Sequence, residues 1–202
     1  MSGSGYGTGT IRLVVSDVDG TLVDSNKEVT PGVQAAVAKL RAAGIGFSII
    51  SARPRSGMMP IAETLGIDGP MGAFNGGTLF KRDGTVLSAD RIDRAVVDGT
   101  LAAAEGAAVD TWVFADDQWY ATTDVGGHVD SERRASNQQP VVTTDFTNLL
   151  DRADKITFVS DDPDLRSTCA SGWTGLPMRR RSSSRRPIIS TSRHCRETRA
   201  MA

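Results

Sequence analysis

The residues best suited to chemistry form one run, DVDGTL at positions 17–22, which directly follows the apolar stretch Ile11 to Ser16. An apolar stretch of this length predicts a fully buried parallel strand, and open α/β sheets bind ligands at the carboxyl ends of such strands. Asp17 at that end can act as a nucleophile, and Asp19 beyond it as a general acid and base. Thr21 can hydrogen-bond within the loop to orient it. The alternative interpretation is a solvated Asp-x-Asp-Gly turn.

Two further groups of polar residues follow predicted strands in the same way. Ser51 and Arg53 come directly after the apolar stretch Ile45 to Ile50, and Asn75 comes after a strand predicted at 71–74. The guanidinium of Arg53 can contact a phosphate through its fork of N–H donors. Taken alone, Ser51 is also typical of a helix cap, and the two glycines after Asn75 are typical of a turn that leads into a hairpin.

The elements that would position these residues alternate between strand and helix. Thr30 and Pro31 are a helix-start signal, and apolar residues then recur at helical spacing until Gly44, which predicts a helix over 31–43. A second helix is predicted over 58–65. The order strand, helix, strand implies a right-handed parallel crossover, so the polar strand ends should meet at one edge of the sheet.

Beyond about residue 84 the pattern changes to antiparallel pairs, which predicts a second, α+β domain. Turn residues at Asp83-Gly84 and at Asp116-Asp117 are each flanked by strand-forming residues, as in hairpins. The hairpin strands are predicted at 78–80 with 85–87 and at 109–115 with 119–123. The remaining predicted elements are a helix over 90–104, a strand over 155–160 and a helix after Pro163.

Together these motifs resemble the haloacid dehalogenase superfamily of hydrolases, in its Cof-like, C2-capped phosphatase branch. The resemblance is carried by DVDGTL after the first strand, Ser51-Ala52-Arg53 after the second and Asn75-Gly76-Gly77 after the third. It implies an α/β fold with an incomplete, N-terminal part of a Rossmann-like core over 11–84 and a partial α+β cap of the C2 type over 85–177. Residues 1–10 are expected to be a flexible lead-in.

The resemblance also implies a role for each residue. Asp17 would attack phosphorus to form an aspartyl-phosphate, and Asp19 would be the general acid and base. The phosphoryl group would be bound by the hydroxyl of Ser51 and the N–H of Ala52, which stands where this branch usually has glycine. Asn75 would orient Asp19 or a substrate oxygen. Mg²⁺ would be held by the Asp17 carboxylate and the backbone carbonyl of Asp19.

The function implied by the resemblance is Mg²⁺-dependent hydrolysis of a small phosphomonoester, such as a sugar phosphate or a phosphoglycolate-like metabolite. The chain lacks the Lys and the Gly-Asp-x-x-Asn-Asp element that complete the family's site, which favours an alternative: an inactive, truncated remnant that at most binds phosphate or Mg²⁺ weakly. A phosphoacceptor receiver domain also uses clustered aspartates and Mg²⁺, but the DVDGTL loop and the inserted cap argue against it.

Composition argues against several other classes of protein. The 202 residues are 39% hydrophobic and 23% charged with a formal net charge of -1, and no apolar stretch approaches the roughly 20 residues of a membrane span. Neither of the two cysteines belongs to a CxxC pair, which gives no support to a disulfide framework or a zinc site and favours the cytoplasm. The expected partner is a small phosphorylated metabolite, not a nucleic acid or a membrane; no oligomeric state is indicated.

Other polar and aromatic residues are assigned to structure. The acidic pair Asp161-Asp162 before Pro163 is typical of a helix start, and His128 is predicted to be an isolated loop histidine. Trp112 and Trp119 are expected to pack within their hairpin, although both could also line a pocket.

The composition shifts abruptly after about residue 177. Residues 178–202 hold eight of the 23 basic residues, all of them arginine, and no helix or strand period. A basic arm that binds nucleic acid is one interpretation, because Arg179 to Arg181 are consecutive. Without aromatic residues or a fold, a frameshifted and disordered tail is the more economical interpretation.

We predict a one-nucleotide frameshift near Pro177 and Met178, with the missing Lys in the neighbouring frame. In the neighbouring reading frame, each new codon consists of the third base of one codon and the first two bases of the next. Read in that frame, the tail is compatible with three consecutive valines and a later Asp-Lys-Gly. Sequencing the DNA is the measurement: restoring one base should open a longer frame with Lys-Gly and then Gly-Asp-x-x-Asn-Asp, and without such a frame the interpretation fails. The restored protein should hydrolyse phosphomonoesters on the order of a hundredfold faster, since removing a preorganised charge slows phosphoryl transfer by about that factor.

Overall fold

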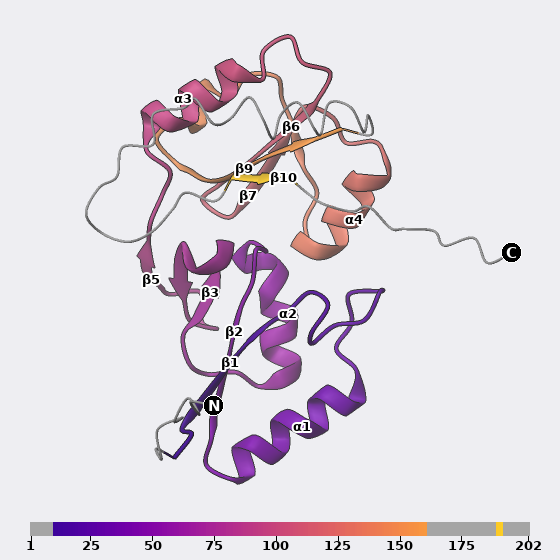
Figure 1. The fold of residues 1–202 in the computed structure, drawn as a ribbon, viewed down its shortest axis with the longest axis vertical. Coiled ribbons are helices and arrows are strands. Elements are labelled where there is room, and N and C mark those ends of the chain that lie inside the picture. The colour runs from indigo at the N-terminus through magenta and orange to yellow at the C-terminus, as the bar shows by residue number, and fades with distance from the viewer. Residues whose placement is uncertain (1–9, 161–188, 192–202) are drawn as a thin grey trace, which may run out of the picture. The chain divides into compact units, whose positions relative to one another are not determined.

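A computed structural model describes residues 10–160 and 189–191 of the chain. Contacts within the chain divide it into two compact units, the first ending at Ala89 and the second beginning at Asp90. Among the described residues, each unit contains a β-sheet and two α-helices (Figure 1). No helix in the described ranges combines the length and the apolar character needed to cross a bilayer.

The first unit contains a five-stranded sheet with the order β1-β2-β3-β4-β5. The parallel strands are β1 (Leu13–Asp17), β2 (Gly46–Ile50) and β3 (Met71–Ala73). The antiparallel strands are β4 (Thr78–Phe80) and β5 (Val86–Ala89). The predicted α/β fold with a parallel crossover is therefore confirmed, as is the hairpin around Asp83-Gly84.

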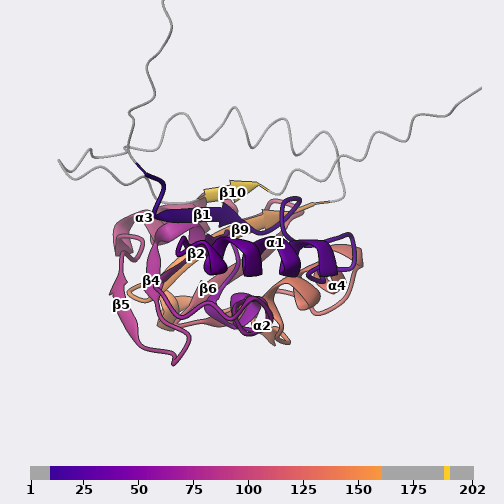
Figure 2. The same cartoon turned by 90° about the horizontal axis from the view of Figure 1, so that it is seen from below.

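Two helices connect the parallel strands and lie on the same side of the sheet (Figure 2). In α1 (Pro31–Ala42) the hydroxyl of Thr30 accepts a hydrogen bond from the N–H of Val33, as expected of an N-cap residue. The second helix, α2 (Arg55–Leu65), ends at left-handed Gly66 and begins earlier than the predicted residue 58. It can start there because Pro54, with its fixed φ of -66°, suits the N-cap position.

β1 is more exposed than its sequence predicts. Ile11, Leu13 and Val15 are 65%, 57% and 55% exposed, although they belong to the stretch predicted to be a fully buried strand. The reason is position: in the described part of the chain β1 pairs only with β2, so its other edge has no neighbouring strand. A strand edge with exposed apolar side chains favours association between chains.

The second unit contains a sheet with the order β10-β9-β6-β7-β8. Its strands are β6 (Asp110–Ala115), β7 (Gln118–Ala121), β8 (Val141–Val142), β9 (Ala153–Val159) and β10 (Ile189–Thr191). Its helices are α3 (Arg94–Ala103) and α4 (Gly127–Ser136). One face of the sheet packs against α3 through Val97, Val113 and Ile156. The β6–β7 hairpin is confirmed, and Asp116 and Asp117 in its turn both have the positive φ that tight hairpins require.

Trp112 and Trp119 pack inside that hairpin as predicted. Their side chains are 4% and 0% exposed, and their rings meet edge to face with centroids 5.1 Å apart. The ring of Trp119 also stacks on Phe114 from the paired strand. Both tryptophans therefore stabilise the second unit by packing.

The structure differs from the sequence prediction at three places in the second unit. The contact boundary lies after Ala89 and not after residue 84, because β5 pairs with β4 and so belongs to the first sheet. His128 lies in α4, which was not predicted, and not in a loop. Ile189–Thr191 pair in parallel with β9 as β10, so the prediction of a tail without regular structure is wrong for these residues.

Several predictions lie outside the described residues. They concern the lead-in at 1–9, the helix start at 161–163 with the helix after it, and the tail at 178–188 and 192–202.

We predict that Val15→Lys reduces self-association of the chain without loss of stability. The side chain is more than half exposed on an unpaired strand edge, where a charge opposes pairing between copies. Light scattering against protein concentration should show less association, while the free energy of unfolding changes by less than about 0.5 kcal/mol. The control is Ile49→Ala in β2, which truncates a side chain that is 1% exposed. This variant should lose about 2–4 kcal/mol of the free energy of unfolding. Equal scattering by the parent and Val15→Lys would contradict the prediction.

Candidate active site

The polar residues at the three parallel strand ends lie along one edge of the first sheet. Asp17, the last residue of β1, is paired in register with Ile50, so Ser51 follows directly on the neighbouring strand. The N–H of Asn75 donates to the carbonyl of Ser51 across 2.7 Å. The structure therefore brings Asp17, Ser51 and Asn75 to the same carboxyl edge, which is where the sequence places them.

The loop after β1 is held by backbone hydrogen bonds to one carbonyl. The oxygen of buried Val18 accepts from the N–H groups of Thr21, Leu22 and Val23. Gly20 has a φ of 77°, a conformation that residues with a Cβ rarely adopt, so glycine suits this turn. The side chain of Thr21 is exposed, and the contact that orients the loop comes from its backbone.

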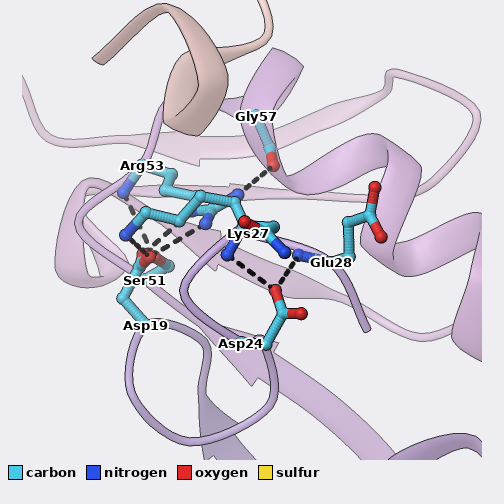
Figure 3. Close-up of polar contacts among 8 residues, drawn as sticks. Asp19, Asp24, Lys27, Glu28, Ser51, Arg53 and Gly57 are labelled. Atoms are coloured by element: carbon cyan, nitrogen blue, oxygen red, sulfur yellow. Dashed lines mark hydrogen bonds and ion pairs between the residues drawn. The ribbon is translucent and has the colours of Figure 1, made fainter. Parts of the chain in front are cut away.

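Two cations hold the carboxylate of Asp19 (Figure 3). The Nε and one Nη of Arg53 donate to its two oxygens, both across 2.9 Å, and the ammonium of Lys27 lies 2.7 Å from Oδ1. Arg53 is only 5% exposed and also donates to the carbonyl of Gly57 across 3.2 Å. The bidentate geometry fixes the position of Asp19 relative to the turn after β2.

These contacts set the charge of Asp19. Its partial burial alone would raise the pKa of the carboxyl group. The hydrogen bonds and charges of Arg53 and Lys27 outweigh the burial and lower the pKa to about 2. Asp19 is therefore ionised at neutral pH and can accept a proton, although the lowered pKa also makes it a weaker base. A proton donor requires the protonated form, so these cations must release Asp19 before it can act as an acid.

The structure places the other predicted phosphate-binding residues as follows. Ser51 is 1% exposed, and its hydroxyl accepts from the N–H of Arg53 across 3.2 Å. Ala52 is exposed beside it. Arg53 was expected to contact phosphate, and its guanidinium is instead directed at Asp19. Asn75 adopts a left-handed conformation with φ 55° and is exposed; the residues that hold Asp19 are Arg53 and Lys27, not Asn75.

Asp17 differs from Asp19 in having its carboxylate free. Within the described ranges this exposed side chain makes no hydrogen bond or ion pair. Its oxygens and the backbone carbonyl of Asp19 are hard donors that suit Mg²⁺, which commonly takes one or two carboxylates and completes its shell with water and phosphate. The donor set therefore fits this metal, although residues 10–160 and 189–191 contain no group of three or more His, Cys, Asp or Glu side chains that could hold an ion.

Lys27 is the residue of this site that the sequence did not reveal. It lies eight residues after Asp19 in sequence, and only the reversal of the chain between Val23 and Val29 brings its side chain back to the strand end. A turn signal at Asp24 to Asn26 was available, but nothing in the sequence gives the direction of the lysine side chain.

Comparisons with known proteins agree on one family. A family model described as haloacid dehalogenase-like hydrolase matches residues 14–174. The phosphoglycolate phosphatase of Thermoplasma volcanium is 33% identical over 76 residues, which are 38% of this chain and 34% of that protein. The pyridoxal phosphate phosphatase YbhA of Escherichia coli is 34% identical over 82 residues, which are 40% of this chain and 30% of that protein.

The solved structures share the fold. A haloacid dehalogenase-like hydrolase from B. subtilis superposes with a TM-score of 0.66 at 18% identity, over 82% of this chain and 67% of that one. The matches to the two curated relatives span only about a third of their length.

We predict that Asp19→Asn lowers stability in a pH-dependent way, because it removes the charged partner of buried Arg53. A pKa lowered by folding contributes stability that is complete above the unfolded value of about 3.9 and disappears as pH falls through about 4 toward 2. At pH 7 the free energy of unfolding of the variant should be about 1 kcal/mol lower than that of the parent. This value is modest because Asp19 is 36% exposed and solvent screens its ion pair with Arg53.

Urea unfolding at a series of pH values measures this difference, which should shrink below pH 4 and be lost as pH falls through about 2. Asp68→Asn is the matched control, since Asp68 is 71% exposed and pairs with Arg41 and Arg82 in solvent. A difference between the parent and Asp19→Asn that stays constant down to pH 2 would contradict the assignment.

Proposed function

Because the chain belongs to the haloacid dehalogenase-like hydrolases, we propose that its first unit is the catalytic core of a phosphatase that hydrolyses a small phosphomonoester. The observation that carries the proposal is the pair of carboxylates at the end of β1. Asp17 is exposed and unpaired in the described part of the chain, while Asp19 two residues later is fixed by Arg53 and Lys27. The same side chain thus occurs in two environments suited to two tasks.

In the proposed reaction Asp17 is the nucleophile. One of its oxygens forms a bond to phosphorus as the bond from phosphorus to the leaving alkoxide breaks, and Asp19 donates a proton to that alkoxide. Water then attacks the phosphorus of the aspartyl-phosphate, the bond from phosphorus to the Asp17 oxygen breaks to release inorganic phosphate, and Asp19 takes the proton of that water. The ionised state in which Asp19 is held matches the second step directly.

We propose Mg²⁺ as the metal, held by the carboxylate of Asp17 and the carbonyl of Asp19. When bound, it would offset the repulsion between two carboxylates and a phosphate dianion. Ser51 and the N–H of Ala52 stand beside Asp17 on the neighbouring strand end and are proposed to bind the phosphoryl oxygens.

The proposed substrate class is a small phosphorylated metabolite, such as a sugar phosphate or a phosphoglycolate-like compound, in the cytoplasm. The curated relatives support a phosphomonoester in general, since one is a phosphoglycolate phosphatase and the other a pyridoxal phosphate phosphatase. Two relatives of similar identity with different substrates do not select one compound for this chain.

A second candidate is a remnant that binds phosphate or Mg²⁺ without turnover. It is favoured by the contacts of Asp19: a carboxylate held by two cations is a poor proton donor, and proton donation to the leaving group is the step that hydrolysis needs first.

We predict that Asp17→Asn reduces hydrolysis of p-nitrophenyl phosphate with Mg²⁺ to the background rate, roughly a thousandfold or more below the parent chain, because an amide is a poor nucleophile. It should also abolish the acyl-phosphate analogue formed with beryllium fluoride. Asp68→Asn, the exposed control, should keep the parent rate. A parent chain that binds phosphate but shows no turnover would favour the remnant, whereas full activity in Asp17→Asn would refute the nucleophile assignment.

A further inference from the structure

Lys27 has a contact pattern that differs from that of Arg53 on the same carboxylate. Arg53 is 5% exposed and has a second acceptor, the carbonyl of Gly57, so it is fixed in place. Lys27 is 23% exposed, and in the described part of the chain Asp19 is the partner of its ammonium. A lysine on a flexible stem with one partner can change that partner more easily than a buried arginine with two.

The two cations that contact Asp19 carry more charge than Asp19 does. The carboxylate of Asp19 carries one negative charge, whereas Arg53 and Lys27 carry one positive charge each, so these three side chains have a net charge of +1, which the carboxylate of Asp17 at the same strand end offsets. The bidentate pair with Arg53 already engages both oxygens of Asp19 and matches its charge, and Lys27 adds a second hydrogen bond to Oδ1. The second cation therefore exceeds what the carboxylate needs and is available to an anion that enters beside Asp17.

The backbone of Lys27 is strained in a way that favours a role for its side chain. The residue has a φ of 69°, in a tight turn where the carboxylate of Asp24 accepts from the N–H groups of Asn26 and Glu28. The N–H of Lys27 donates to the carbonyl of Asp24, and Val23 pairs with Val29 across the turn. Glycine or asparagine adopts this conformation more readily than lysine.

We propose that Lys27 is a phosphoryl-binding residue, whose ammonium is held by Asp19 in the free protein and moves to the oxygens of a bound phosphate. This inference rests on the proposed phosphatase site and adds a residue to it. A phosphate dianion has more charge and more acceptor oxygens than one carboxylate, so it competes well for the ammonium. Transfer of Lys27 to the phosphate also removes one of the two cations from Asp19.

The test is titration of the full chain with inorganic phosphate in the presence of Mg²⁺, by calorimetry. Lys27→Asn should weaken phosphate binding about tenfold or more, the usual effect of losing a charge-assisted hydrogen bond. Its thermal stability should equal or exceed that of the parent, because asparagine accepts a positive φ. Lys27→Arg should stay within about threefold of the parent affinity, since it keeps the charge.

The control is Lys39→Asn, which removes the same charge from an exposed position in α1 and should leave the affinity unchanged. Equal phosphate binding by the parent and Lys27→Asn overturns the inference while leaving the phosphatase proposal intact. A Lys27→Asn variant that unfolds shows a structural ion pair and overturns it as well. A parent chain that does not bind phosphate overturns both proposals. A parent that binds phosphate through Lys27 without hydrolysing p-nitrophenyl phosphate refutes the phosphatase proposal alone.

Discussion

The ion pair between Asp19 and Arg53 joins the loop after β1 to the turn after β2, and the carboxyl edge of the first sheet depends on it. These residues are 34 positions apart in sequence, and their side chains meet because Asp17 and Ile50 are paired in a parallel register. Burial of the guanidinium makes the contact specific, since a buried charge without its partner is costly. The site is thus fixed by the sheet register and by one charge pair.

Much of this arrangement could be predicted because it is local in sequence. Apolar stretches that end in polar residues gave the parallel strands, and Asp-Gly and Asp-Asp pairs marked the hairpins. The helix α4 escaped prediction because GHVDSERRAS has one large apolar residue and so no helical period. The exposure of Leu13 and Val15 does not follow from the apolar stretch itself, since burial of a strand depends on its neighbours in the sheet.

The side-chain contacts of the candidate site likewise could not be predicted from the sequence. The positions of Asp17, Asp19, Ser51 and Asn75 at one edge follow from the strand order, but the partners of their side chains do not. Arg53 can serve a phosphate or a carboxylate equally well by its chemistry, and only the coordinates show that Asp19 holds it. The position of the Lys27 side chain depends on the left-handed backbone conformation of Lys27 itself, which residues other than glycine and asparagine rarely adopt.

Binding and turnover therefore make opposite demands on the same charges. In the proposed phosphatase, phosphate binding would gain from the positive charges of Arg53 and Lys27, because each is a cation at the edge where Asp17 is exposed. Proton donation by Asp19 is hindered by both, because they stabilise its ionised form. A phosphate that takes Lys27 from Asp19 relaxes the conflict in part, while Arg53, fixed by Gly57, continues to hold the carboxylate. On the proposed function, these contacts favour binding of a phosphate over protonation of its leaving group, and phosphate affinity compared with turnover number distinguishes a phosphatase from a remnant.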